Sequence, residues 1–315
     1  MSRRFALITF SFLVIVVILC LLFPNLPGKL HVENINGADT AWMLASTALV
    51  LIMTPGLAFF YGGMVNKKNV LSTMLQSFIS MAVITIVWVV FGFSLAFGDS
   101  IFGIIGNPKT FFLMKDVIDG PSWKLAPTIP FILFAFYQLK FAIITPALIT
   151  GAFAERMKFT AYIVFIVLFC IFIYCPLAHA TWHPNGLLAK WGVLDFAGGT
   201  VVHMSAGWAA LASALYLKKR NEPAHNKNYL CVAGNRFTVV RLVWFNAGSA
   251  FHADTLAAIA IATTSTASAA AAITWIIFDA VRGRKPGAMG TCIGAVVGLV
   301  AITPAAGFIT IPQSL

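Results

Sequence analysis

Long apolar stretches recur from one end of this chain to the other, and they constrain its fold more than any other feature. A helix needs about 20 mostly apolar residues to cross the hydrocarbon core of a bilayer. We expect such spans at residues 5–23, 41–63, 74–97, 128–153, 159–178, 197–217, 229–250, 255–280 and 287–305. Only 10% of the residues are charged, against about a quarter in soluble domains. The sequence therefore predicts an all-α polytopic membrane protein.

The basic residues predict how these spans are oriented. Lys and Arg collect in the cytoplasmic connections of membrane proteins. With the N-terminus inside, the outer connections hold only Lys29, Lys109, Lys115, Lys124 and Lys190. Lys140, Arg236 and Arg241 fall inside predicted spans, where a charge costs at least about 2.5 kcal/mol. The net charge of +11 is thus explained by orientation, and no nucleic-acid partner is predicted.

Residues 1–29 are expected to be a signal sequence or an N-terminal anchor. Arg3 and Arg4 precede an apolar stretch, Phe5–Phe23, and no Ala-x-Ala cleavage site follows it. The sequence contains no Walker loop and no cluster of metal ligands, and its five cysteines lack zinc-site spacing. We therefore predict neither an enzyme nor a bound cofactor or metal.

Asp195 and His203 are the polar residues that most suggest function. Asp195 stands where an outer connection turns into the span 197–217, a natural N-cap position. If the helix begins there, His203 lies about 12 Å deeper, at 1.5 Å per residue. A structural cap and a histidine satisfied by a neighbouring helix are the alternatives. An imidazole near the membrane midplane nevertheless predicts a functional site.

Short motifs spread from residue 38 to residue 307 resemble those of the ammonium transporter (Amt/MEP/Rh) family. They are Ala38–Trp42, Pro55–Gly63, Gly151–Arg156, Asp195–His203 with Leu215–Arg220, Trp244–Ala250 and Ile302–Gly307. They follow the order of the family, so their joint specificity is high. The resemblance implies an eleven-helix fold with two inverted five-helix halves, a homotrimer with a pore in each subunit, and a place in the cell (inner) membrane.

The resemblance also implies a set of site residues. The family recruits ammonium with an outer aromatic cage and a serine, supported from behind by an aspartate. Two stacked phenylalanines gate the pore, and a histidine lines it. The aromatic cage and the serine correspond to Tyr137, Trp182 and Ser249, and the aspartate corresponds to Asp195. The gating pair corresponds to Phe141 and Phe245, and the histidine to His203. Aromatic faces attract cations and hydroxyl groups accept N–H bonds, whereas an apolar pore passes neutral ammonia more easily than ammonium.

The predicted topology brings the outer residues of this set together. The span 128–153 runs inward, which places Tyr137 one turn outside Phe141 on the same face. The span 229–250 runs outward, which places Ser249 one turn outside Phe245. Trp182 is expected in an outer loop.

The match departs from the family in three places. The second pore histidine of the family belongs to its tenth helix, and helices nine to eleven have no counterpart before Leu315. Residues 30–315 are therefore expected to form an incomplete transporter domain of eight family helices. Residues 229–245 keep the length of a span but lose the Gly-rich motif, as compensating frame errors would produce. Lys140 replaces a small residue; it weakens recruitment if it points into the pore and is harmless if it snorkels outward.

The main functional prediction is transmembrane transport of ammonium or ammonia through a hydrophobic pore. A truncated, transport-inactive family member is the first alternative, and an ammonium sensor is the second. A trimeric signal protein of the PII type on the cytoplasmic face is a partner implied by the resemblance alone.

Overall fold

Helices make up nearly all the regular structure of the chain in the computed structural model, which describes residues 3–24, 28, 34–219 and 228–315. The α-helices are α1 (Arg3–Leu22), α2 (Gly37–Leu51), α3 (Met53–Gly62), α4 (Val70–Val87), α5 (Phe93–Phe97), α6 (Phe131–Phe153), α7 (Phe159–Phe169), α8 (Cys175–Trp182), α9 (Leu187–Lys190), α10 (Ser205–Leu217), α11 (Asn228–Gly248), α12 (Thr255–Val281) and α13 (Ala288–Ile302). Three π-helical turns, η2 (Trp88–Gly92), η4 (Cys170–Tyr174) and η5 (Gly199–Met204), continue neighbouring helices. The 3₁₀ turns are η1 (Lys67–Asn69), η3 (Phe112–Met114) and η6 (Pro312–Ser314), and β1 (Ser100–Ile101) pairs antiparallel with β2 (Ile105–Gly106).

Consecutive helices join into the spans that the sequence predicts. Segments long and apolar enough to cross a membrane cover Arg3–Leu22, Gly37–Gly62, Lys67–Phe97, Phe131–Phe153, Phe159–Lys190, Gly199–Leu217 and Thr255–Val281. The helix α13 is apolar but shorter. The all-α polytopic architecture is thus confirmed, although the predicted span 229–250 is not among these segments of the described residues and several boundaries shift. The span predicted at 74–97 begins at Lys67, and the one predicted at 159–178 continues beyond residue 178.

Prolines shape two of these spans. Pro55 lacks an N–H, so it cannot donate to the carbonyl of Leu51, and the helix breaks there into α2 and α3. Pro130 precedes α6, which therefore begins at Phe131, three residues later than predicted.

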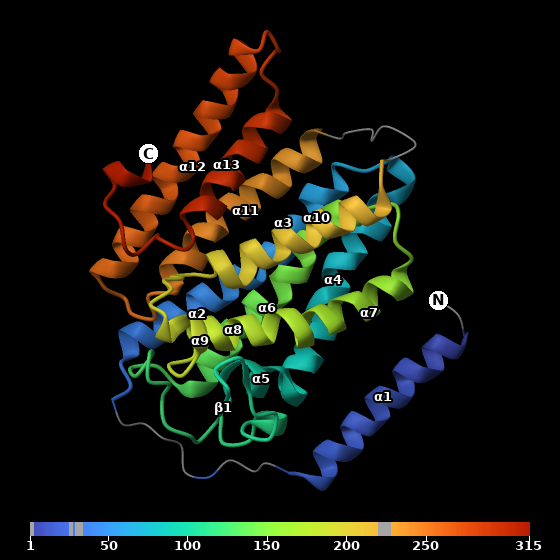
Figure 1. Ribbon diagram of the computed structural model, residues 1–315, viewed down its shortest axis with the longest axis vertical. Coiled ribbons are helices and arrows are strands. Elements are labelled where there is room, and N and C mark those ends of the chain that lie inside the picture. The colour runs from blue at the N-terminus through green and yellow to red at the C-terminus, as the bar shows by residue number, and fades with distance from the viewer. Residues whose placement is uncertain (1–2, 25–27, 29–33, 220–227) are drawn as a thin grey trace.

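The helix α1 stands apart from the other helices (Figure 1). None of its residues is buried, as expected for an apolar helix surrounded by lipid. Beyond its end, the ring of Phe23 meets that of Phe112 edge-on at 6.3 Å, and Gly28 N–H donates to Asp119 Oδ2 at 2.7 Å. The interpretation of residues 1–29 as a signal sequence or an anchor stays a prediction.

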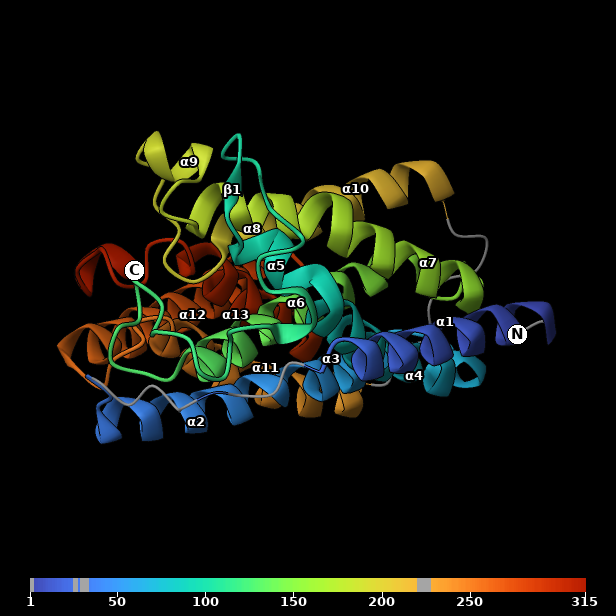
Figure 2. The same cartoon turned by 90° about the horizontal axis from the view of Figure 1, so that it is seen from below.

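The connection 98–127 folds back over α8 and α9. Figure 2 shows β1 beside α9 on one edge of the molecule, and Leu187 N–H donates to Gly103 O at 2.8 Å. The connection is also tied to α5, because Phe111 N–H donates to Ser94 Oγ at 2.7 Å. It covers one end of the helices around α6.

Contacts between helix ends agree with the predicted alternation of the spans. At one end of the bundle, Thr128 Oγ1, just before α6, donates to Asp39 Oδ2 at the start of α2 (2.6 Å). At the other end, Asn66 N–H, just after α3, donates to Glu155 Oε1, just after α6 (2.8 Å). The sequence assigns the first end to the outside, and we name the two the outer end and the inner end.

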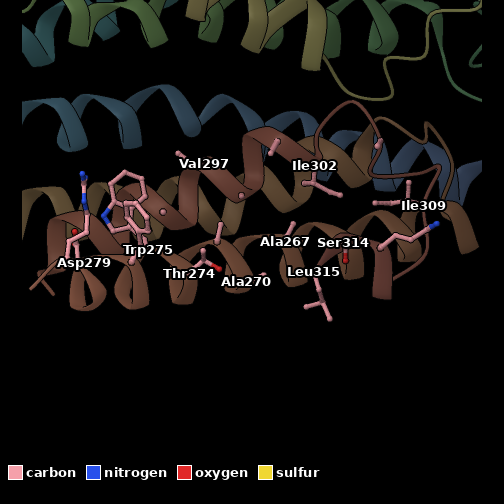
Figure 3. Close-up of a pocket in the computed structure, with 18 of the residues that line it drawn as sticks. Ala267, Ala270, Thr274, Trp275, Asp279, Val297, Ile302, Ile309, Ser314 and Leu315 are labelled. Atoms are coloured by element: carbon pink, nitrogen blue, oxygen red, sulfur yellow. The ribbon is translucent and has the colours of Figure 1, made fainter.

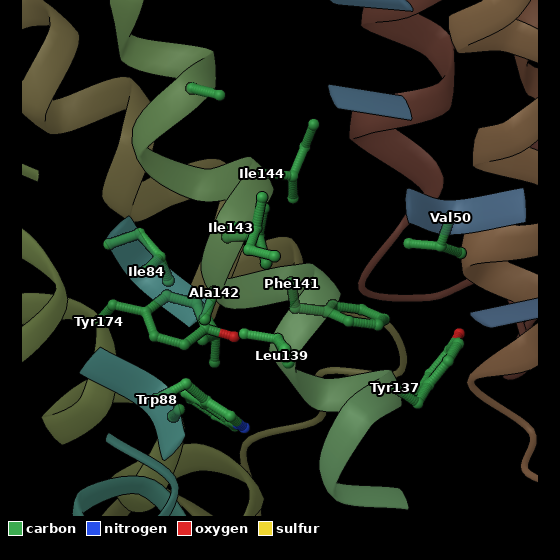
Figure 4. Close-up of a cluster of buried hydrophobic side chains, with 14 of the residues drawn as sticks. Val50, Ile84, Trp88, Tyr137, Leu139, Phe141, Ala142, Ile143, Ile144 and Tyr174 are labelled. Atoms are coloured by element: carbon green, nitrogen blue, oxygen red, sulfur yellow. The ribbon is translucent and has the colours of Figure 1, made fainter. Parts of the chain in front are cut away.

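The helix α6 runs through the hydrophobic core and positions the site. Tyr137 and Phe141 leave one side of α6, and Trp88 and Tyr174 lie against the opposite side (Figure 4). Trp88 Nε1 donates to the carbonyl of Ala135 at 3.1 Å, which fixes η2, the continuation of α4, against α6. Tyr137 and Phe141 share a face because they are one helical turn apart.

The stretch 229–245, which departs from the family motif, is helical and forms most of α11. The helix continues to Gly248, so the loss of the family motif does not interrupt the span. The side chains of Arg236 and Arg241 lie outside the described residues, as do Lys29, Arg220 and Lys227.

Candidate functional site

A cavity of about 50 Å³ lies at the outer end of the bundle. Its lining residues are mostly aromatic: Phe97, Trp123, Leu125, Phe134, Gln138, Phe141, Trp182, Phe196, Ser249 and Phe251. Three residues singled out in the sequence, Phe141, Trp182 and Ser249, are therefore brought together. We name this the outer cavity.

Phe141 is the centre of the aromatic contacts at the site. Its ring meets the indole of Trp182 edge-on, with centroids 5.9 Å apart and planes at 89°. On another side it stacks on Phe245, with centroids 4.1 Å apart and planes at 29°. Tyr137 packs against it at 5.0 Å. All four predicted aromatic residues thus form one cluster.

Tyr137 supports the outer cavity from behind. It is fully buried and is absent from the lining residues. Its hydroxyl donates to the carbonyl of Phe245 at 2.8 Å and lies 3.3 Å from Ser249 Oγ. Ser249 Oγ donates to the same carbonyl at 2.9 Å. Because its proton is used there, Ser249 Oγ keeps lone pairs with which to accept an N–H from a ligand.

Trp182 is held by a hydrogen bond from its indole. The prediction that it lies in an outer loop is wrong, because it is the last residue of α8. Pro176 is tolerated in the first turn of α8, so the helix continues until His183 takes an extended conformation. Trp182 Nε1 donates to the carbonyl of Asp195 at 3.0 Å, which fixes the plane of the indole.

Asp195 caps the helix that carries His203. Its Oδ1 accepts from the N–H groups of Gly198 and Gly199 at 2.7 and 2.6 Å. Its Oδ2 accepts from those of Thr200 and Val201 at 2.9 and 3.1 Å. Burial raises the pKa of this carboxyl, and the four N–H donors oppose the rise. Asp195 thus satisfies the N–H groups that a helix start leaves free.

The helix begins at Gly199 rather than at Asp195. Gly198 has φ +103°, a left-handed conformation that favours glycine and ends the preceding loop. The predicted depth of His203, calculated for a helix starting at residue 195, is therefore wrong. His203 lies instead in the π-helical turn η5, a feature that is frequent at functional sites.

His203 lines a second cavity of about 50 Å³, the inner cavity. The other lining residues are mostly apolar: Met53, Leu57, Phe60, Tyr61, Ile144, Leu148, Thr238, Leu242, Val296 and Val300. His203 Nε2 is buried and has no hydrogen-bond partner among the described residues. The imidazole lies 6.0 Å from the ring of Phe245, measured between centroids. A third cavity, of about 270 Å³, shares Tyr61 and leads toward Met64 and Val65 near the inner end.

These contacts arrange the site residues in a line. Phe141 lines the outer cavity and stacks on Phe245, and Phe245 contacts His203, which lines the inner cavity. From the outer end, the order along this line is Ser249 and Trp182, then the two rings, then the imidazole.

Gln138 and Phe251 are two of the seven lining residues of the outer cavity that were not predicted from the sequence. Gln138 is only 5% exposed, and its Oε1 has no partner among the described residues. A polar residue directly after Tyr137 in an apolar span was the signal for it. Phe251 follows the last turn of α11 with φ +60°, and nothing in the sequence pattern pointed to it.

Lys140 points away from the outer cavity. Its ammonium group lies 5.7 Å from the centroid of the Phe136 ring, and it is not among the lining residues of the described cavities. Of the two orientations left open by the sequence, the one outside the cavity is therefore observed. A long stem allows such a charge to reach a more polar environment.

A larger groove, of about 810 Å³, lies elsewhere, between α12, α13 and the C-terminal segment (Figure 3). Trp275 and Asp279 stand at one end, and Ser314 and Leu315 at the other. Its walls are mostly small and apolar, and it contains none of the predicted site residues. Size alone does not mark it as the site.

Comparison with known proteins places the chain among transport proteins. A sequence model described as the Ammonium Transporter Family matches residues 41–315. A protein named "Putative ammonium transporter" from Methanothermobacter thermautotrophicus is 45% identical over 287 residues, which cover 89% of this chain and 69% of the relative.

Solved structures agree with this comparison. The crystal structure of Saccharomyces cerevisiae Mep2 superimposes with a TM-score of 0.83 and 37% identity, covering 90% of this chain and 64% of that one. A protein titled "Sensor Amt Protein" superimposes with a TM-score of 0.79 and 28% sequence identity, covering 88% of this chain and 70% of that one. The chain thus spans about two thirds of the length of its relatives. The predicted helical bundle of this type is confirmed.

Proposed function

The chain belongs to the ammonium transporter family, a family of transport proteins rather than enzymes, and we propose that it carries ammonium or ammonia across a membrane. The route we propose runs from the outer cavity, past Phe141 and Phe245, to the inner cavity. The observation that carries the proposal is the stacked pair of rings between two cavities. The outer one is aromatic and contains hydrogen-bond acceptors, and the inner one is apolar and contains His203 Nε2, which has no partner among the described residues.

Recruitment of the cation fits the chemistry of the outer cavity. Ammonium has four N–H donors and a positive charge, so it needs acceptors and π faces. Ser249 Oγ donates its own proton to the carbonyl of Phe245, and Gln138 Oε1 has no partner within the described part of the chain, so both oxygens can accept an N–H from ammonium. The rings of Trp182 and Phe141 add cation–π attraction, worth about 2 kcal/mol when desolvated.

Passage beyond the rings favours the neutral molecule. Taking an ion into an apolar environment costs far more than taking a neutral amine there. The inner cavity is lined almost entirely by aliphatic and aromatic side chains, with His203 as its titratable imidazole. We propose that ammonium transfers its proton to water on the outer side of the stacked rings, that the resulting ammonia passes the rings, and that His203 Nε2 accepts or donates a hydrogen bond along the path.

Assembly and regulation belong to the same proposal. We expect a homotrimer in the cell (inner) membrane, with a PII-type signal protein at the inner end as a partner. Residues 1–29 would direct or anchor the chain. These expectations rest on the family resemblance.

Sensing is the second candidate function. The similarity to the "Sensor Amt Protein" supports it, at 28% identity against 37% for Mep2. Since the two share the fold, only an activity measurement separates them. We favour transport because the route described above reaches from the outer end toward the inner end.

Uptake of radiolabelled methylammonium tests the proposal directly. The chain is expressed in a strain that lacks its own ammonium transporters, and uptake is compared with that of the empty vector. We expect saturable uptake that is lost in His203→Ala. The variant Thr238→Val is a matched control, because Thr238 lines the same inner cavity and valine keeps its shape.

Three outcomes decide the matter. Uptake by the wild type and by Thr238→Val, but not by His203→Ala, supports a route through the inner cavity. Uptake that survives His203→Ala contradicts the proposed role of the imidazole. If the chain reaches the membrane in folded form but shows no uptake, the transport proposal is contradicted. The inactive and sensing alternatives then remain.

A further inference from the structure

The outer cavity has an aromatic wall and a support that the family resemblance did not supply. We propose that Phe251 is an additional cation-binding face of the outer cavity, and that Asp39 and His252 are the residues that position it. This inference rests on the proposed function, because it takes the outer cavity to bind ammonium or its alkylated analogues.

The short segment between α11 and α12 carries two of the lining residues. The helix α11 ends at Gly248 and α12 begins at Thr255, and both Ser249 and Phe251 line the outer cavity. Phe251 has φ +60°, a conformation that residues other than glycine, asparagine and aspartate rarely adopt. Such a conformation persists only where its surroundings hold it in place.

The ring of Phe251 is packed on one side and lines the cavity on another. Its centroid lies 5.4 Å from that of Phe134 and 5.9 Å from that of Tyr137, with planes at 51° and 80°. Both neighbours are buried residues of α6. Phe251 itself is only half-buried and faces the same cavity as Trp182. Its π face can therefore add to the attraction that Trp182 exerts on a cation.

A hydrogen-bonded cluster holds the segment directly after Phe251. Ala253 N–H donates to Asp39 Oδ1 at 2.8 Å. His252 Nδ1 lies 3.1 Å from Asp39 Oδ2, and 3.1 Å from Thr128 Oγ1. Because Thr128 Oγ1 donates its own proton to Asp39 Oδ2 (2.6 Å), and a carboxylate only accepts, Nδ1 is assigned as a donor shared by both oxygens. One carboxylate thus binds two consecutive residues of the segment.

The carboxylate that makes these bonds is itself anchored. Asp39 is 8% exposed and stands in the first turn of α2, where the helix dipole favours a negative charge. Asn36 caps α2 through its side chain, and its N–H donates to the carbonyl of Thr128 at 2.8 Å. The start of α2 and the connection before α6 therefore form one fixed support. Loss of the bonds to His252 and Ala253 would free the backbone of Phe251.

The inference predicts a change in affinity rather than in passage. Phe251 and its support act on the outer cavity alone, so their loss should raise KM and leave Vmax nearly unchanged. The probe is radiolabelled methylammonium, measured both as uptake against concentration and as equilibrium binding to the purified chain. We expect Phe251→Leu, which keeps an apolar side chain, to raise KM about fivefold.

Variants of His252 test the positioning role. We expect His252→Ala to raise KM about threefold, and His252→Asn to restore it, because an asparagine amide can replace the Nδ1–H donor. In the Phe251→Leu background, His252→Ala should add little, because it acts through the ring that is already missing. Asp254→Asn is the matched control in the same segment, since asparagine also caps α12.

A structural readout separates failure of this inference from failure of the proposed function. Hydrogen exchange at the Ala253 amide is slow if Asp39 binds it, and should accelerate in Asp39→Ala, which removes the acceptor, and in His252→Ala. If the wild type transports methylammonium but Phe251→Leu leaves KM unchanged, the proposed cation-binding role of Phe251 is wrong, and the transport function stands. If the wild type neither binds nor transports methylammonium, both the transport function and the cation-binding role of Phe251 are wrong. Hydrogen exchange at the Ala253 amide then decides the positioning role of Asp39 and His252. Exchange that is equal in all variants overturns that role.

Discussion

Phe141 and Phe245 stack with ring centroids 4.1 Å apart, and this contact stands between the outer and the inner cavity. Phe141 comes from α6 and Phe245 from α11, so the route is closed where two long helices meet. Both rings are almost completely buried. Opening the route therefore requires that the rings separate or turn.

Removal of one ring should open the route to water. In Phe245→Ala the stack is lost, and we expect a several-fold rise in osmotic water permeability of proteoliposomes, measured by stopped-flow light scattering. The thermal stability should fall as well, because truncation of a buried phenylalanine costs about 3–5 kcal/mol.

The matched control is Phe153→Ala. Phe153 is equally buried, but it packs on Tyr162 and Phe165 and is not a lining residue of the outer or the inner cavity. It should lose a similar amount of stability without any gain in permeability. An equal gain in both variants would mean that loosening of the bundle, and not the ring pair, controls the route.

Gln138 should contribute to recruitment through its unpaired Oε1. A hydrogen bond to a charged group contributes about 1.5–3 kcal/mol, so Gln138→Leu should raise KM for methylammonium at least about tenfold. Gln76→Leu is the control, because Gln76 is buried to the same degree and also has an unpaired Oε1, but lines none of the described cavities. A rise in KM in both variants would assign the effect to general destabilisation.

Asp195 should be a stability determinant of the outer end. In Asp195→Asn an amide N–H₂ would face two of the four N–H donors, which leaves buried donors unpaired. We expect a loss of about 2–4 kcal/mol, detected as a lower unfolding temperature in detergent. Asp254→Asn, where the new side chain keeps the one partly buried cap bond, should change little. Equal stability of the two variants would contradict the capping role of Asp195.

The fold was largely predictable because a lipid bilayer leaves few choices. Spans need long apolar helices, and the stretches beginning near Phe5, Phe131 and Thr255 show them without ambiguity. The same rule could not predict the π-helical turns or the extension of α8 to Trp182. These depend on local hydrogen bonds such as those at Gly198, which periodicity does not encode.

The site was predictable where a residue stands one helical turn from its partner. Tyr137 and Phe141, and likewise Phe245 and Ser249, share a face for that reason, and they meet in the structure. Phe251 was not predictable, because its position follows from a left-handed turn held by a carboxylate more than 200 residues earlier in the chain.

The position of Lys140 leads to the last prediction. A cation in the outer cavity would repel ammonium, but the Lys140 ammonium group lies over the Phe136 ring, which does not line that cavity. We therefore expect Lys140→Met to change KM for methylammonium by less than about twofold. Gln138→Lys is the contrasting variant, because it places the same charge in the wall of the cavity and should abolish saturable uptake. A several-fold fall in KM in Lys140→Met would show that the charge acts on the outer cavity after all. Equal behaviour of the two variants would remove the distinction between them that the structure makes.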